Sequence, residues 1–262
     1  MQLFRRILKL NGKDSTTFLN SLCTNTLKEP ITYGLFLSPQ SRVLLDAFYF
    51  KLNNEAYLDI HEPFTDVLLS HIRKYKLRND IELTSVHGSV HWHKDFTTTT
   101  GTLFKDPRPL MGYRSIIVDK KEPVVLSDAH EYTLHRYQQG IPEPSDVLNT
   151  LPFDLNLDIV NAVDYTKGCY TGQELLIRTK HIGVVRKRAI CFKINNASQY
   201  NTNDLKGESV TVNDKSIGKI INYIRNKNTL YGLCIIKLNK FEQSAVVRDC
   251  PVQLHLPSYI NK

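Results

Sequence analysis

The sequence predicts an α+β body followed by a small β-barrel, and two patterns in the chain support this fold class. Before Gly183, segments with strand-like alternation mix with segments of helical periodicity, as expected for an α+β domain. After Gly183 the apolar segments are short and strand-like, turn residues separate them, and no strong helix pattern appears. Several short strands at this spacing predict a barrel of about seventy residues.

The body opens with a strand that ends at the turn Asn11-Gly12, and a short helix follows with Asp14 as its N-cap. A longer helix opens at Glu62-Pro63, because proline suits the first turn of a helix. A third helix stops at Gly140, a residue that favours the helix C-terminus. Strands are expected at 3–10, 33–37, 42–50, 56–60, 81–86 and 90–94.

The tail after Gly183 supplies the expected strands of the barrel. Turn residues at Asn213-Asp214 and Asn226-Lys227-Asn228 separate some of them. The strands are expected at 188–194, 208–212, 216–224, 229–238 and 245–256. We therefore expect two domains, a body of residues 1–185 and a barrel of residues 186–262.

Composition and charge restrict the function classes. The chain has 262 residues, and no apolar run approaches the ~18 residues of a membrane span, so no membrane partner is expected. Five scattered cysteines without a C-x-x-C motif argue against a disulfide framework and indicate a reducing compartment. The net charge of +8 permits an anionic partner. The basic residues form no recognised DNA- or RNA-binding motif, so nucleic acid is not the expected partner.

The most informative stretch is Lys167-Gly168-Cys169-Tyr170-Thr171-Gly172-Gln173-Glu174, which leads directly into a helix pattern. Thr171 and Glu174 have the spacing of a capping box, so Thr171 is the expected N-cap. Cys169 would then precede a helix N-terminus, whose dipole favours an anion, and basic residues lie on both sides. These conditions predict a lowered thiol pKa and a reactive thiolate. The two glycines allow a sharp bend or a close approach to a ligand.

Residue types alone leave alternatives open at three places. Cys169 is either a reactive group or a small apolar residue that packs in a turn. Asp46 is either a catalytic carboxylate or the solvent-facing residue of a strand. His91 and His93 alternate along one strand, but no cysteine or carboxylate stands at matching spacing. We therefore expect a polar strand face there and no metal site.

The eight-residue stretch resembles the K-G-C-[aromatic]-x-G-Q-E signature of the YgfZ family of folate-binding proteins, and every fixed position is present. That family is similar to the T-protein (aminomethyltransferase) of the glycine cleavage system and includes mitochondrial assembly factors for iron–sulfur clusters. Further segments resemble family patterns: residues 37–46, where Ser41 replaces the usual glycine, Asp106-Pro107-Arg108, and Arg136 with Gly140-Ile141-Pro142-Glu143.

The resemblance implies the T-protein (aminomethyltransferase) folate-binding fold, with two intertwined α/β subdomains and a C-terminal β-barrel. It implies tetrahydrofolate or a derivative as cofactor, with Cys169 as the reactive centre. Cys169 would act as a thiolate donor, a transient cluster ligand or a redox group. Asp46 falls where T-protein relatives carry an acidic pair in their catalytic region. The residues expected to bind the cofactor are Lys167, Gly168, Tyr170, Gly172, Gln173, Glu174, Arg178 and Arg136.

The expected function is that of a folate-binding accessory protein for the maturation or repair of iron–sulfur enzymes. Its expected partners are a reduced folate and iron–sulfur client proteins or their assembly machinery. The alternative is a folate-dependent aminomethyl transferase with Asp46 as its carboxylate, although glycine-cleavage T-proteins lack the cysteine signature. A hydrolase using Cys169 is a further alternative, but no histidine partner can be named. The first strand begins near Met1, so bacterial cytoplasm is expected, with the mitochondrial matrix as the alternative.

Overall fold

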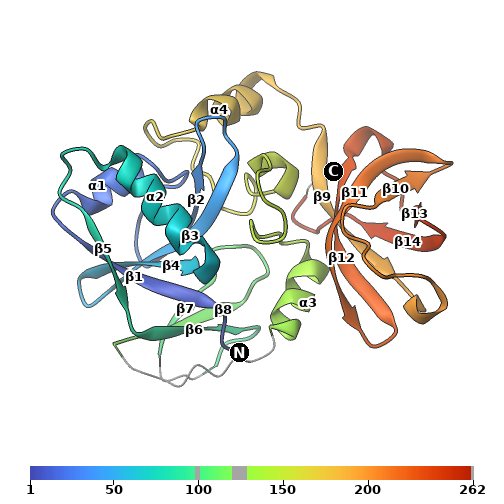
Figure 1. Ribbon diagram of the computed structural model, residues 1–262, viewed down its shortest axis with the longest axis horizontal. Helices are drawn as coiled ribbons and strands as arrows, with labels where there is room; N and C mark the ends of the chain where they lie inside the picture. Colours follow the sequence, from blue (N-terminus) through green and yellow to red (C-terminus); the bar gives the residue numbers. More distant parts are fainter. Residues whose placement is uncertain (98–100, 120–128, 261–262) are drawn as a thin grey trace. The chain divides into compact units, whose positions relative to one another are not determined.

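The computed structural model describes residues 1–97, 101–119 and 129–260 (Figure 1). Its backbone divides into two compact units, each built from two segments of the chain. The first unit combines Met1–Ala129 with Val160–Arg178, and the second combines His130–Ile159 with Thr179–Lys262. The expected domains, 1–185 and 186–262, differ from these units because residues 130–159 and 179–185 group with the barrel.

The first unit is built on a five-stranded antiparallel sheet in the order β2-β3-β4-β1-β5. Its strands are β1 (Arg5–Asn11), β2 (Ile31–Leu37), β3 (Val43–Leu52), β4 (Glu55–His61) and β5 (Glu82–Val86). Helices α1 (Ser15–Asn20) and α2 (Thr65–Lys76) share one apolar core with the sheet, which includes Leu19 and Leu68. Each expected strand of this sheet occurs within a few residues of its predicted bounds, because alternating burial is a local property.

A second, three-stranded sheet in the first unit has the order β6-β8-β7. Its strands are β6 (Gly88–His93), β7 (Thr102–Lys105) and β8 (Tyr113–Val118). The buried Trp92 of β6 donates its indole N–H to the carbonyl oxygen of Met111 at 2.7 Å. His91 and His93 lie on either side of Trp92 and make hydrogen bonds to the hydroxyls of Ser89 and Ser115.

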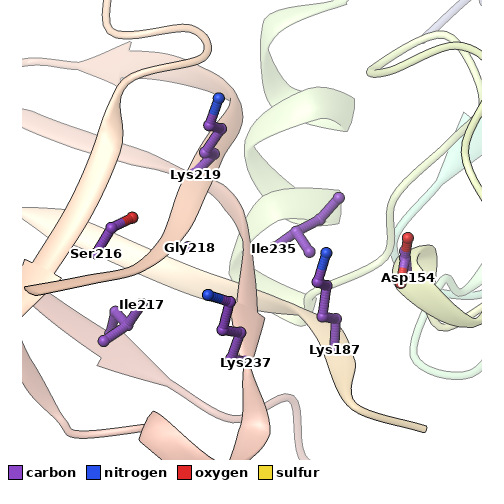
Figure 2. A pocket seen from close by; sticks show the side chains of 8 residues that line it. All are labelled: Asp154, Lys187, Ser216, Ile217, Gly218, Lys219, Ile235 and Lys237. Atoms are coloured by element: carbon purple, nitrogen blue, oxygen red, sulfur yellow. The ribbon is translucent and has the colours of Figure 1, made fainter.

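The second unit contains a closed six-stranded barrel in the order β10-β11-β12-β9-β14-β13. Its strands are β9 (Lys187–Ile194), β10 (Ser209–Val212), β11 (Lys215–Asn226), β12 (Thr229–Lys237), β13 (Ser244–Val247) and β14 (Cys250–His255). The expected strand at 245–256 is two strands, because a turn at Arg248, with φ of 52°, reverses the chain. Lys187, Lys219 and Lys237 project from three neighbouring strands of this barrel (Figure 2).

Two further helices complete the fold. Helix α3 (His130–Gln139) contacts β9, β11 and β12 of the barrel, and α4 (Gln173–Ile182) begins at the last two residues of the signature stretch. Short 3-10 helices occur at Glu62–Phe64, Pro152–Leu155, Ala197–Gln199 and Leu238–Lys240. Within the described ranges, no helix has both the length and the apolar character required to cross a membrane.

Candidate functional site

Residues 167–172 of the signature stretch form a loop before α4, and this loop presents Cys169 to solvent. All five cysteines of the chain lie in described residues, and Cys169 is the exposed one, whereas the other four are buried. Burial raises the pKa of the Cys23 and Cys234 thiols, and it raises the pKa of Cys191 to about 12. Cys169 is therefore the thiol of this chain that a reagent or partner in solution can reach.

Lys167 connects this loop by hydrogen bonds to the end of α1 and to the residues that follow it. Its half-buried ammonium donates hydrogen bonds to the carbonyl oxygens of Asn20, Cys23 and Asn25 at 2.7, 2.7 and 2.9 Å. Burial lowers the pKa of Lys167, and the nearby Cys23 and Asp164 oppose that shift. With three carbonyl acceptors, the ammonium has its full set of hydrogen bonds, so its main observed role is to hold the loop in place.

Gly172 brings the loop against the turn after β2. The hydroxyl of Ser41 donates to the carbonyl oxygen of Gly172 at 2.6 Å. Gly172 has φ of 80°, and a Cβ atom there would lie 2.4 Å from the carbonyl oxygen of Ser38. Ser41, which replaces the family's usual glycine, also has a left-handed φ of 61°. Serine therefore adopts the left-handed conformation at this turn, and its hydroxyl bonds to the signature loop. At Gly168, by contrast, an added Cβ meets nothing within 4 Å.

Tyr170 and Gln173 lie on the protein side of the loop. The backbone N–H of Tyr170 donates to Oε1 of Gln173 at 3.3 Å. The prediction of Thr171 as N-cap was wrong, because α4 begins at Gln173 and the left-handed Gly172 separates Thr171 from it. The Tyr170 ring is buried, and its hydroxyl has no hydrogen-bond partner among the described residues. Burial, followed by the charges of Cys23 and Asp164, raises the pKa of Tyr170 to about 12.

Glu174 and Arg178 lie on the exposed face of α4, within the same first unit as the signature loop. They are one turn apart on the helix, since residues four positions apart lie on the same face. Their carboxylate and guanidinium groups are therefore open to a ligand that approaches α4.

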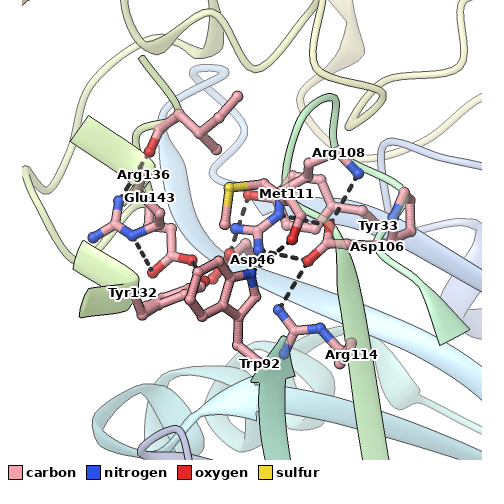
Figure 3. Close-up of polar contacts among 12 residues, drawn as sticks. Tyr33, Asp46, Trp92, Asp106, Arg108, Met111, Arg114, Tyr132, Arg136 and Glu143 are labelled. Carbon is pink, nitrogen blue, oxygen red and sulfur yellow. Dashed lines mark hydrogen bonds and ion pairs between the residues drawn. The ribbon is translucent and has the colours of Figure 1, made fainter. Parts of the chain in front are cut away.

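Asp46 lies in a buried arginine–aspartate cluster of the first unit, made of Arg5, Asp46, Asp59, Asp106, Arg108 and Arg114. Figure 3 shows Asp46, Asp106, Arg108 and Arg114 of this cluster. Its side chain is 1% exposed, so the solvent-facing interpretation of this residue was wrong. The hydroxyl of Tyr33 donates to Oδ2 of Asp46 at 3.1 Å, and a guanidinium nitrogen of Arg5 lies 4.0 Å from Oδ1. Buried carboxylates need such partners, because an unpaired charge in the interior is strongly destabilising.

The Asp106-Pro107-Arg108 segment supplies the other side of this cluster. Arg108 donates to both carboxylate oxygens of Asp106, at 2.9 and 2.8 Å. Burial by itself raises the pKa of Asp106, but the charges of Arg108 and Arg114 outweigh it, and the net pKa is lowered. Arg114 also lies 3.7 Å above the ring of Phe48. Sequence reasoning missed Arg114 and Asp59, although an aspartate within the apolar run of β4 was a signal for a buried ion pair.

Arg136 belongs to a buried network of the second unit (Figure 3). Its guanidinium donates to Asp146 at 2.8 Å and to the carbonyl oxygen of Ile141 at 2.9 Å. Nε of Arg136 lies 3.6 Å from Oε2 of Glu143, and Tyr132 donates to the other oxygen of that carboxylate. Burial opposes the charged form of Arg136, but Asp146 and Glu143 raise its pKa. These contacts favour a structural role, and cofactor binding by Arg136 remains a prediction.

The expected site residues thus fall into three groups, one of which is the exposed pair Glu174 and Arg178 on α4. The loop residues 167–173 lie together in the first unit, held by Lys167 and Gly172, with the thiol of Cys169 outward. Asp46 and Arg136 are each buried in ion-pair networks. Among residues 1–97, 101–119 and 129–260, no group of three or more histidine, cysteine, aspartate or glutamate side chains is placed to hold a metal ion.

Comparisons with known proteins agree with this architecture. No family model matches the chain. It is 34% identical over 219 residues to the mitochondrial iron–sulfur cluster assembly factor IBA57 homolog of Mycosarcoma maydis, covering 71% of this chain and 54% of that protein. It is 31% identical over 225 residues to human mitochondrial IBA57, covering 70% and 63%. The matched region spans about half to two thirds of the length of these relatives.

A solved structure shows the fold. The glycine cleavage system aminomethyltransferase T from Bartonella henselae aligns with a TM-score of 0.70 over 99% of this chain and 85% of that chain, at 11% identity. The expected T-protein fold, a mixed α/β body with a C-terminal barrel, is confirmed.

Proposed function

The chain belongs to the YgfZ family, and from this premise we propose that it is an accessory protein for the maturation or repair of iron–sulfur enzymes. Relatives at 31–34% identity are named iron–sulfur cluster assembly factors, which supports the proposal. The observation that carries it is Cys169, the exposed thiol on a loop that contacts of Lys167 and Gly172 connect to neighbouring segments. An accessible cysteine at a fixed position suits transfer chemistry and soft-metal binding.

We propose that Cys169 acts as a thiolate donor, as a transient cluster ligand or as a redox group toward a client protein or the assembly machinery. Each of these roles requires a thiol that a second macromolecule can reach, which the buried Cys23, Cys191, Cys234 and Cys250 do not provide. In the cluster-ligand role the iron and sulfide are cargo, so the chain needs no metal site of its own.

Tetrahydrofolate is the proposed cofactor, and the residues around the loop fit it in two respects. The buried hydroxyl of Tyr170 lacks a partner among described residues, so a polar group of the ligand would satisfy it. Gly168 has open space where a side chain would stand, which allows a flat ring to approach the backbone. The exposed Arg178 would hold an anionic glutamate tail. A bound tetrahydrofolate supplies a carrier for one-carbon groups, while Tyr170 and Arg178 orient it.

The transferase alternative is less well supported. It needs a carboxylate close to a folate nitrogen, and Asp46 is instead buried, with the Tyr33 hydroxyl and the Arg5 guanidinium as neighbours. The mitochondrial matrix is the proposed location, because the named relatives are mitochondrial and do not support the expected bacterial cytoplasm.

Replacement of Cys169 by serine tests the proposed function. Because the side chain is exposed, Cys169→Ser should change the free energy of unfolding by less than about 0.5 kcal/mol. Serine barely ionises near neutral pH and is a poor soft-metal ligand, so the variant should fail to restore iron–sulfur enzyme activity in cells that lack the native protein. Cys250→Ser, at a buried cysteine, is the control and should restore activity if it folds. Full restoration by Cys169→Ser would reject a role for the thiol.

Replacement of Tyr170 by phenylalanine tests the folate proposal separately. The hydroxyl is buried without a partner in the described structure, so Tyr170→Phe should leave stability unchanged or raise it by up to about 1 kcal/mol. If the hydroxyl binds the cofactor, the same change should weaken tetrahydrofolate binding by about fivefold to tenfold. Isothermal calorimetry and thermal unfolding measure the two effects. Unchanged affinity with raised stability would show that the hydroxyl does not contact folate.

A further inference from the structure

Two adjoining hollows mark the surface of the barrel where β9, β11 and β12 lie side by side. The smaller, of about 280 Å³, is lined by Asp154, Lys219 and the pair Lys187 and Lys237 (Figure 2). The larger, of about 820 Å³, shares Lys187 and Lys237 and continues to Arg186. We call the two hollows together the barrel groove. All of its lining residues belong to the second unit.

The charges in the barrel groove are nearly all of one sign. Lys187 of β9 and Lys237 of β12 are direct partners in the antiparallel register, so two ammonium stems stand opposite each other. Like charges in this arrangement destabilise a sheet. Lys219 of β11 lies on the same face of the sheet as this pair, because its register partner Ile235 is two positions before Lys237. Asp154 is the single carboxylate among the lining residues. The groove therefore favours a ligand that brings negative charge to these strands.

The larger hollow also carries apolar surface. Val184 and Leu238 line it, and Val184 is 78% exposed. The neighbouring Ile182, at the end of α4, is 83% exposed. An exposed aliphatic side chain such as Val184 beside a cationic rim is typical of a protein-binding surface.

We propose that the barrel groove docks an acidic segment of a partner protein, with an apolar side chain of that segment in the larger hollow and its carboxylates over Lys187, Lys219 and Lys237. The combination of cations and aliphatic side chains selects this class of partner. Nucleic acid is a poorer match, because none of the residues that line either hollow is aromatic and none offers a surface for base stacking. The proposal uses none of the residues of the signature loop and does not depend on the chemistry of Cys169.

The test uses the full chain and a fluorescent peptide composed of glutamate, leucine and alanine, with the binding followed by anisotropy. The double variant Lys187→Glu with Lys237→Glu should weaken binding by about tenfold or more. Lys206→Glu with Lys227→Glu is the matched control, because both lysines are exposed turn residues of the same unit and the net charge changes equally. The control should retain affinity within about twofold. Val184→Ser should weaken binding by about threefold to tenfold.

A single charge reversal distinguishes an effect on peptide binding from an effect on the stability of the fold. Lys187→Glu places opposite charges across β9 and β12, so it should raise the melting temperature by roughly 1–2 °C while it weakens the peptide complex. Equal losses in the groove variant and the control would reduce the interaction to net charge and overturn the proposal. Unchanged binding in the groove variant would overturn it as well. Tighter binding of a single-stranded oligonucleotide, lost in the same groove variant, would assign the surface to nucleic acid instead.

Discussion

Replacing Arg136 by methionine should lower the free energy of unfolding by about 3–5 kcal/mol. The guanidinium lies buried between Asp146 and Glu143, and methionine would leave both carboxylates in the interior without their cation. The deficit should shrink as the pH falls, because protonation removes the charge of a buried carboxylate that has lost its cation. Urea unfolding of the variant and the native chain at pH 5 and pH 8 measures both effects.

Arg178→Met is the matched control for this change. Arg178 was also expected to bind the cofactor, but its side chain is exposed on α4, so its loss should change stability by less than about 0.5 kcal/mol. The two variants thus distinguish an arginine that stabilises the fold from an arginine that binds the cofactor. If Arg178 holds the anionic tail of folate, its variant should bind folate polyglutamates less tightly at unchanged stability. A stable Arg136→Met variant with weakened folate binding would instead give Arg136 the role in binding.

Replacing Gly172 by alanine should destabilise the first unit by about 2–3 kcal/mol. The added Cβ would lie 2.4 Å from the carbonyl oxygen of Ser38, and the φ of 80° is unfavourable for any side chain. Relief of this clash requires the loop to separate from the turn at Ser41, whose hydroxyl bonds to Gly172. We expect faster proteolysis between Lys167 and α4 as a direct sign of that separation.

Gly168→Ala provides the comparison within the same loop. An alanine there meets no atom within 4 Å, so stability should stay within about 0.5 kcal/mol of the native value. If folate approaches the backbone at Gly168, the variant should bind tetrahydrofolate more weakly although it is fully folded. Equal stability of the Gly172→Ala and Gly168→Ala variants would show that the contact with Ser38 does not restrain the loop.

The local patterns of the sequence determined the order of the elements. Alternation of apolar residues placed the strands of the first sheet and of the barrel, and the turn at Asn226-Lys227-Asn228 separates β11 from β12 as expected. The K-G-C-Y-T-G-Q-E stretch identified the family and placed Cys169 in a loop before a helix, since the motif and the following helix pattern are contiguous in the chain. The capping-box pattern predicted the wrong N-cap at Thr171, because contacts with distant segments determine the backbone conformation of this loop.

The tertiary structure alone decided which polar residues are buried and with what partners. Lys167 bonds to Asn20, 147 positions earlier, and Arg114 bonds to Asp59, 55 positions earlier. Asp46, which a strand pattern would place in solvent or in a catalytic site, is instead enclosed beside Arg5 and Tyr33. Burial and charge pairing depend on residues that meet only after the chain has folded, and no local pattern encodes which cation neutralises which carboxylate.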